Sequence, residues 1–309
     1  MHELDVARHS NLVDPALHVW GWEIPVYLFL GGMAAGTLFL SALLWSRTEP
    51  RSRTARLLPF AAPVLLALGM GALFLDLSRK LHVFRFYLAF RWTSPMSWGA
   101  WILLVVFPVA ILFGIATLAE ADVEALAARA PGVAALVRKV RPFATGHARG
   151  LRMAAAVTAV GLGGYTGVLL STLGARALWG SALLGPLFLV SGISSGAALA
   201  MLLPVSEDER AFLGRADVHA MWLELALIAF FLVGLATGGE ASRAAAALVL
   251  GGAFTAPFWA LVVVAGLVVP SAMELLERRL HLAATAVAPA LVLAGGLALR
   301  WILVAAGQR

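Results

Sequence analysis

The chain has 309 residues, of which 61% are hydrophobic and only 13% charged, and its mean hydropathy is +0.90. Soluble proteins average about 45–50% apolar and about 25% charged residues, so the composition excludes a disordered chain, a soluble enzyme domain and a nucleic-acid-binding domain. The net charge of +6 is typical of basic loops on a membrane protein, and the absence of cysteine excludes disulfides, thiolate metal sites and a self-ligated iron–sulfur cluster.

Apolar runs long enough to cross a bilayer recur along the whole chain. A membrane helix needs about 20 mostly apolar residues. No run alternates with the period of two that a membrane barrel strand shows. The sequence therefore predicts one all-α integral membrane domain over residues 1–309. Its eight transmembrane helices are expected at 24–45, 57–76, 98–119, 153–173, 182–203, 218–236, 244–269 and 282–304.

The longest stretch between these runs is 120–152, which is rich in Ala and Arg. We expect it to be a cytoplasmic linker that separates two four-helix halves. FLGGMAAG (29–36) resembles FLVSGISSG (188–196), which favours a parallel repeat of the halves. Gly32 and Gly36, like Gly192 and Gly196, have the spacing that lets helix backbones pack closely within a bundle.

The positive charges of the loops predict the orientation. Most Lys and Arg residues outside the spans lie in the odd-numbered loops, which are therefore assigned to the cytoplasm, with both termini outside in the periplasm. The loop 77–97 is basic although it is assigned outside. Leu77, Leu81, Phe84 and Leu88 fall there at helical spacing, which predicts an amphipathic segment. Such a segment either lies on the membrane surface or docks an acidic or cofactor-bearing partner.

Ionisable residues at the outer ends of the spans form the first candidate site. A charge near the bilayer centre costs at least ~2.5 kcal/mol, so such residues usually face a cavity or a partner. On the predicted topology, the outer face gathers Glu23, Tyr27, Asp76, Arg79 and Tyr165. Ordinary structural roles explain them equally well, because acids are favoured at helix N-termini and an acid and an arginine form simple ion pairs.

A second group lies deeper in the predicted bundle. His219 and Glu224 fall in the cytoplasmic half of the sixth span and Arg300 in the outer half of the eighth, and they are candidates for a proton path. A polar contact between helices is an equal alternative. Haem b in a membrane bundle usually needs paired axial histidines, and only His219 lies plainly within a span, so no haem is expected in this chain.

Five stretches, in order along the chain, give it a marked resemblance to the NrfD family, the membrane subunit of polysulfide-reductase-type complexes. The strings SPMSWG and LRW…AGQ are the most specific, and Ser78 stands where the family usually has Gly. The stretches are WGWEIPVYLFLGGMAAG (20–36), LDLSR (75–79), SPMSWGAWIL (94–103), YTGVLLS with PLFLVSGISSGAAL (165–199) and LAGGLALRWILVAAGQ (293–308).

The resemblance implies a quinone-binding membrane subunit in the cytoplasmic (inner) membrane of a bacterium or archaeon, in contact with membrane lipid. It implies menaquinone or ubiquinone as the cofactor, bound near the outer face, with no haem or iron–sulfur cluster in this chain. It also implies a ferredoxin-like iron–sulfur partner that serves a molybdopterin or multihaem catalytic subunit. The chain would then not act alone on the terminal substrate, and a homodimer is left open.

The family's quinone pocket lies among its first four helices, and four residues match its positions. Glu23 and Tyr27 match first-span pocket positions, where some members carry Asn and His. Tyr165 matches a tyrosine expected to hydrogen-bond a quinone carbonyl. Asp76 matches an acid expected near the pocket or in the proton route, and Arg79 ends the same stretch.

Quinol oxidation releases two electrons and two protons, so the site needs both a donor and an acceptor. A tyrosine hydroxyl can donate and a carboxylate can accept. We therefore expect Glu23 or Asp76 to be the immediate proton acceptor. Two other functions remain, a passive anchor and a secondary transporter. The transporter predicts helices broken at matching positions in the two halves, whereas Pro108 and Pro289 do not correspond.

Overall fold

The computed structural model describes residues 20–47, 51–77, 80–88, 90–172, 176–280 and 285–309. This part of the chain is helical and contains no strand. Eight of its helical stretches are long and apolar enough to cross a membrane, in agreement with the predicted all-α architecture. These stretches are Glu23–Arg47, Arg53–Asp76, Pro95–Thr117, Ala148–Ser171, Leu184–Met201, Glu207–Ala236, Thr255–Leu280 and Val287–Gly307.

Six of the stretches, the first span among them, are single helices, and two join shorter segments. The other five single helices are α5 (Pro95–Thr117), α8 (Ala148–Ser171), α9 (Leu184–Met201), α10 (Glu207–Ala236) and α14 (Val287–Gly307). The second span joins α2 (Arg53–Leu57), η1 (Leu58–Phe60) and α3 (Ala61–Asp76). The seventh joins α12 (Thr255–Pro257), the π-helical η3 (Phe258–Val268) and α13 (Val269–Leu280). The first span is α1 (Glu23–Arg47).

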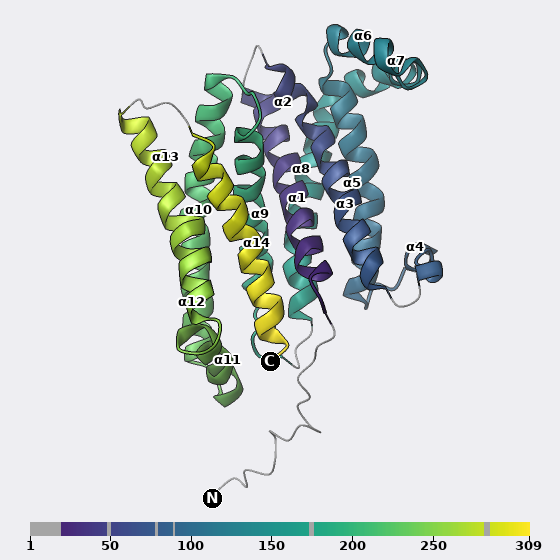
Figure 1. The fold of residues 1–309 in the computed structure, drawn as a ribbon. Coiled ribbons are helices and arrows are strands. Elements are labelled where there is room, and N and C mark those ends of the chain that lie inside the picture. The colour runs from purple at the N-terminus through teal and green to yellow at the C-terminus, as the bar shows by residue number, and fades with distance from the viewer. Residues whose placement is uncertain (1–19, 48–50, 78–79, 89, 173–175, 281–284) are drawn as a thin grey trace, which may run out of the picture.

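Helix α1 lies at the centre of the bundle and packs against α3, α8, α9 and α14 (Figure 1). Its contact with α9 is made by glycines. A Cβ atom at Gly36 would overlap the Gly192 backbone, and one at Gly196 would overlap the backbone of Gly36 and Thr37. The predicted close packing of these small residues within one bundle is confirmed. Because backbone meets backbone here, α1 is held at a fixed depth and rotation.

The two ends of the bundle carry different short helices (Figure 1). Helix α2 and a hairpin of α6 (Glu120–Arg129) and α7 (Pro131–Gly146) lie at one end, called here the α6–α7 end. Helix α4 (Arg85–Leu88) and the C-terminus lie at the other, called the α4 end. The predicted orientation would place the α6–α7 end in the cytoplasm.

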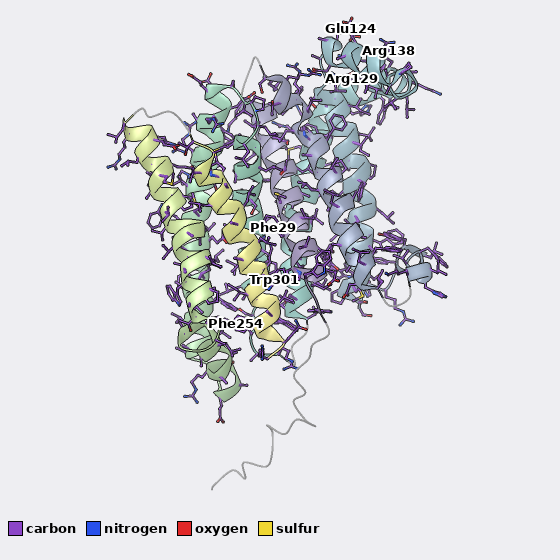
Figure 2. The ribbon with its side chains drawn as sticks, viewed as in Figure 1. Phe29, Glu124, Arg129, Arg138, Phe254 and Trp301 are labelled. Carbon is purple, nitrogen blue, oxygen red and sulfur yellow. The ribbon has the colours of Figure 1, made fainter. Side chains whose placement is uncertain are left out.

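Residues 120–152, expected to form the linker, are mostly helical, since α6, α7 and the first turn of α8 occupy most of them. Val123 and Val137 pack with Ile115 of α5 in a small apolar core. Asp122 accepts a hydrogen bond from the Arg56 Nε at 2.6 Å and another from the Ala119 backbone at 3.0 Å. These contacts dock the hairpin on the bundle. Its charged residues Glu124, Arg129 and Arg138 lie at this end of the bundle (Figure 2).

The sixth and seventh spans differ from their expected ranges. Helix α10 begins at Glu207, well before 218, because Ser206 and Glu209 form a reciprocal cap at its start. The seventh span was expected at 244–269. Instead α11 (Glu240–Leu250) ends before Gly251, and the span runs from Thr255 to Leu280. Charged residues in α13 lower its local hydropathy, so the apolar pattern of the sequence does not extend to this end of the span.

The loop 77–97 does not form one continuous amphipathic helix. It contains the short η2 (Lys80–His82) and the single turn α4. Leu81 and Leu88 are 88% and 76% exposed, whereas Leu77 faces a cavity inside the bundle. The apolar side chains are therefore divided between the outer surface and that cavity.

Candidate functional site

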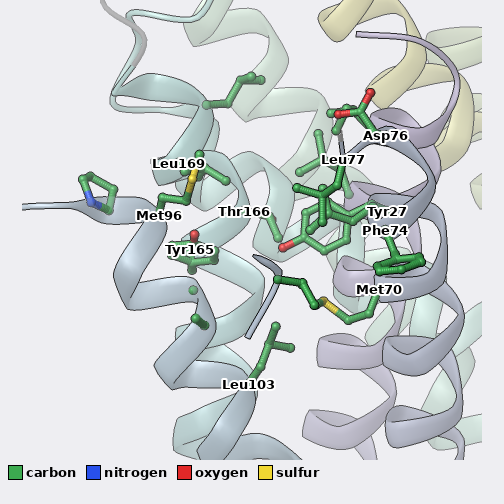
Figure 3. Close-up of a pocket in the computed structure, with 18 of the residues that line it drawn as sticks. Tyr27, Met70, Phe74, Asp76, Leu77, Met96, Leu103, Tyr165, Thr166 and Leu169 are labelled. Atoms are coloured by element: carbon green, nitrogen blue, oxygen red, sulfur yellow. The ribbon is translucent and has the colours of Figure 1, made fainter. Parts of the chain in front are cut away.

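A cavity of about 730 Å³ lies at the α4 end of the bundle (Figure 3). Helices α1, α3, α5 and α8 form its walls, and Val83 and Tyr87 border it from the loop that contains α4. Its volume is within the range of about 300–1,000 Å³ common for small-molecule sites. Most of the wall is apolar, with side chains such as Met70, Phe74 and Leu103.

The chain has three tyrosines, and all three line this cavity. Tyr27 of α1 and Tyr165 of α8 are 8% and 7% exposed and enter the cavity from different sides (Figure 3). Burial raises the pKa of Tyr87, so its hydroxyl stays protonated at neutral pH and can donate. Three phenol groups thus supply hydrogen-bonding capacity to a largely apolar wall.

Tyr87 was not singled out from the sequence. It lies in the loop 77–97, whose pattern drew attention to its leucines rather than to its tyrosine. One signal in the sequence could have identified Tyr87: tyrosine is rare in a chain that has sixteen phenylalanines. A tyrosine hydroxyl in so apolar a sequence usually has a hydrogen-bond partner or a ligand.

The position of Tyr165 depends on a glycine of the neighbouring helix. Gly99 of α5 faces the Tyr165 ring so closely that a Cβ atom there would overlap the phenol. The Tyr165 hydroxyl oxygen is the nearest atom to that Cβ position, so it lies close to the Gly99 backbone. Gly99 therefore makes room for the ring and limits where its oxygen can lie. This glycine belongs to the string SPMSWG (94–99).

Two acids lie close together at the edge of the cavity. Asp76 is the last residue of α3 and lines the cavity, while Glu23 is the first residue of α1. The two carboxyl groups are near enough to interact electrostatically. Glu23 does not itself line the cavity, although its neighbour Ile24 does. Arg79 lies outside the described residues.

Trp20 forms part of the cavity wall just before α1. Its ring stacks on Trp179, with 5.1 Å between the ring centroids. The Trp179 indole N–H donates a hydrogen bond of 2.8 Å to the Leu303 carbonyl of α14. The wall at Trp20 is thus supported by the last helix of the chain.

Glu224 and Arg300 lie together on the other side of α1. Arg300 is fully buried and donates from Nη1 to the Ser191 hydroxyl at 2.9 Å and to the Gly296 carbonyl at 2.8 Å. Glu224 is 2% exposed and interacts with Ser191 and Arg300. His219 is not part of this group. Its ring is exposed, because residues five apart on a helix lie on different faces.

Comparison over the whole chain shows what kind of protein carries this cavity. The family model described as "Polysulphide reductase, NrfD" matches residues 5–309. The chain belongs to the NrfD family. The predicted family relationship is confirmed, and the eight apolar helices make this family member a multi-pass membrane protein.

Three relatives illustrate the similarity. "Protein NrfD" of Escherichia coli (strain K12) is 34% identical over 304 residues, covering 94% of this chain and 95% of the relative. The C chain of the polysulfide reductase of Wolinella succinogenes is 29% identical over 305 residues, covering 94% of both proteins. "Protein NrfD homolog" of Haemophilus influenzae is 28% identical over 264 residues, covering 82% of each.

In this NrfD-family chain, four of the five stretches that carry the resemblance meet at the cavity. Trp20 and Tyr27 come from the first stretch, Asp76 from the second, Gly99 from the third and Tyr165 from the fourth. These stretches are far apart in the chain and on four different helices. The fold brings them together around one cavity at the α4 end.

Proposed function

We propose that the chain is the quinone-binding membrane subunit of a respiratory oxidoreductase, and that the quinone ring occupies the cavity among α1, α3, α5 and α8. The observation that carries this proposal is the convergence of all three tyrosines and Asp76 on one apolar cavity. One of the relatives is named as one of the chains of polysulfide reductase, which supports a role as one part of a larger enzyme.

The wall chemistry fits a quinone. A quinone has a flat ring with two oxygen atoms and an apolar tail, so it needs an apolar cavity with a few polar groups. When bound, it carries two electrons and two protons between its oxidised and reduced forms. The Tyr165 hydroxyl, oriented by Gly99, would donate to a ring oxygen. Asp76 would accept a proton from a quinol hydroxyl, with Glu23 close by to receive it next.

The location of the cavity also bears on the partner. Electrons must leave the quinone for a carrier that this cysteine-free chain does not supply from its own thiolates. We propose that a ferredoxin-like iron–sulfur subunit docks at the α4 end and passes electrons to a molybdopterin or multihaem subunit. Lys80, Leu81 and Trp92 are exposed at that end and offer both charge and apolar surface. The distribution of Lys and Arg favours the periplasmic side of the inner membrane for this end.

The test is a quinone titration of the purified chain, followed by tryptophan fluorescence. Trp20 lines the cavity, so a bound quinone should quench its emission. We expect saturable quenching. The Tyr165→Phe variant should bind quinone about 2–10-fold more weakly, which is the effect of one lost hydrogen bond. Asp76→Asn should slow quinol oxidation by the assembled complex while the complex still forms.

Thr237→Val provides a matched control. Thr237 is exposed, and its hydroxyl donates a hydrogen bond to the Val233 carbonyl at the end of the same helix. Trp20→Phe should lower the quenching amplitude. Unchanged affinity in Tyr165→Phe, together with unchanged turnover in Asp76→Asn, would reject this site. If the folded chain alone shows no saturable binding, the same titration on the complex separates a partner-completed site from a passive anchor.

A further inference from the structure

A second buried acidic group lies in α10 and α13, on the other side of α1 from the cavity. Asp217 of α10 is fully buried and Glu274 of α13 is 6% exposed. Their carboxyl groups interact electrostatically across the contact between the two helices. The function proposed above assigns no role to either residue.

Several polar atoms of this group lack hydrogen-bond partners. Asp217 Oδ1 accepts a hydrogen bond of 2.5 Å from the Ser194 hydroxyl of α9. Asp217 Oδ2, both carboxyl oxygens of Glu274 and Nη2 of Arg278 have no partner in the described part of the chain. Buried polar atoms are almost always paired with protein or water. The oxygens of two neighbouring carboxyl groups can satisfy each other only when a proton lies between them.

A glycine lets the charged side chains of α13 approach α10 closely. A Cβ atom at Gly214 would lie 3.0 Å from Arg278 Nη2 and 3.2 Å from Glu274 Oε2. Gly214 is on α10, one turn before Asp217, so it faces the same group of side chains. A side chain there would press on both the guanidinium and the carboxyl group. Two acids packed this closely beside one cation suit a shared proton.

The surrounding charges are few. Besides Arg278, the groups that act electrostatically on Glu274 or on Arg278 are Glu277 of α13 and Arg210 and Arg215 of α10. Glu224, further along α10, also interacts electrostatically with Asp217, and the neighbouring helix α9 contributes the Ser194 hydroxyl. Two adjacent carboxyl groups in a water-poor site do not both ionise readily, because like charges repel and burial penalises each charge.

We propose that Asp217 and Glu274 hold one exchangeable proton between them and form a proton-binding site at the α6–α7 end of the bundle. The proton moves between a carboxyl oxygen and water, and no other bond changes. Glu274 is six residues from the end of α13 at Leu280, or about 9 Å along the helix, which is a short way from the bundle end.

Polar side chains continue from this pair into the bundle. Glu224 lies two turns beyond Asp217 on the same face of α10, about 10 Å away. Ser191, one turn before Ser194 on α9, interacts with both Glu224 and Arg300. Arg300 in turn reaches α1, where its guanidinium lies 5.7 Å from the Phe29 ring. These residues form a polar row that α1 separates from the cavity.

The role of this row in quinone-linked proton movement rests on the function proposed above, whereas proton binding by the pair does not. The test is infrared spectroscopy of the full chain in lipid nanodiscs, with pH titration of the C=O band of protonated carboxyl groups. We expect a band that persists at neutral pH and disappears in both Asp217→Asn and Glu274→Gln, because the two residues share one proton. Glu207→Gln, an exposed acid in the first turn of α10, is the matched control and should leave the band unchanged.

Gly214→Ala keeps both carboxyl groups and covers the case in which a carboxyl variant fails to fold. Its methyl group should push Arg278 away from Glu274 and shift the titration midpoint to higher pH. A band that neither carboxyl variant removes, or a midpoint that Gly214→Ala leaves unchanged, would overturn the proposal. A band that appears only when Na⁺ is replaced by choline would overturn it in favour of a monovalent-cation site. Quinone titration of the same variants should match the wild type, so a failure here is distinguishable from a failure of the quinone site.

Discussion

Gln308 and Trp20 are 288 residues apart in the sequence and form two hydrogen bonds with each other. The Trp20 backbone N–H donates to Gln308 Oε1 at 2.9 Å, and Gln308 Nε2 donates back to the Trp20 carbonyl at 3.1 Å. The side-chain amide of the penultimate residue thus completes the backbone hydrogen bonds just before α1. Because Trp20 lines the cavity, the end of the chain supports the cavity wall.

We predict that Gln308→Leu lowers stability by about 1–3 kcal/mol, since two partly buried backbone groups lose their partner. It should also weaken quinone binding, because Trp20 is no longer held. Thermal unfolding in detergent and the fluorescence titration measure the two effects. Gln308→Glu keeps the acceptor and the size but loses the donor, so its effect should be intermediate. Wild-type stability in Gln308→Leu would contradict the supporting role.

Gly99→Ala should lower quinone affinity about tenfold, because the new methyl group displaces the Tyr165 ring from its place against α5. Quenching titrations measure the change. Gly164→Ala is the control, since nothing lies within 4 Å of its Cβ position although it neighbours Tyr165 on α8. Equal affinities for the two variants would show that the orientation of Tyr165 does not matter.

Gly36→Ala should destabilise the bundle by about 3 kcal/mol or more, because the methyl group would meet the Gly192 backbone rather than a movable side chain. Low yield and an early unfolding transition are the expected observations. Gly234→Ala, in the α10 span with open space around it, should behave like the wild type. A folded Gly36→Ala protein of ordinary stability would mean that α1 and α9 can separate without cost.

The α6–α7 hairpin should be sensitive to acid. The hydrogen bond from Arg56 holds the pKa of Asp122 below its ordinary value. The stabilisation is therefore fully present above the unfolded value of about 4 and is lost as the pH falls through the lower folded value.

Asp122→Asn should remove roughly 1–2 kcal/mol at pH 7, and the difference from the wild type should narrow below about pH 4. Melting temperatures across pH 7 to 3 provide the measurement. Glu124→Gln, an exposed acid on the same helix, is the control. A pH-independent difference between wild type and Asp122→Asn would contradict an ionic role for Asp122.

The sequence by itself determined the helical class, the number of spans and the family. It also singled out Tyr27, Asp76 and Tyr165, which lie on separate helices. Span number is predictable because hydropathy is a local property: a bilayer requires a long apolar run wherever the chain crosses it. Few charged residues interrupt such runs, so the sequence also identifies Glu224 and Arg300 as buried charges.

Only the tertiary structure decided which side chains meet. Tyr87 reaches the cavity from a loop, and His219 lies away from Glu224 although it is close in sequence. Asp217 and Glu274 lie just outside the expected ranges 218–236 and 244–269, because charged residues lower the hydropathy of the helix ends that contain them. Their burial comes from packing between α10 and α13, a long-range contact that no local pattern encodes.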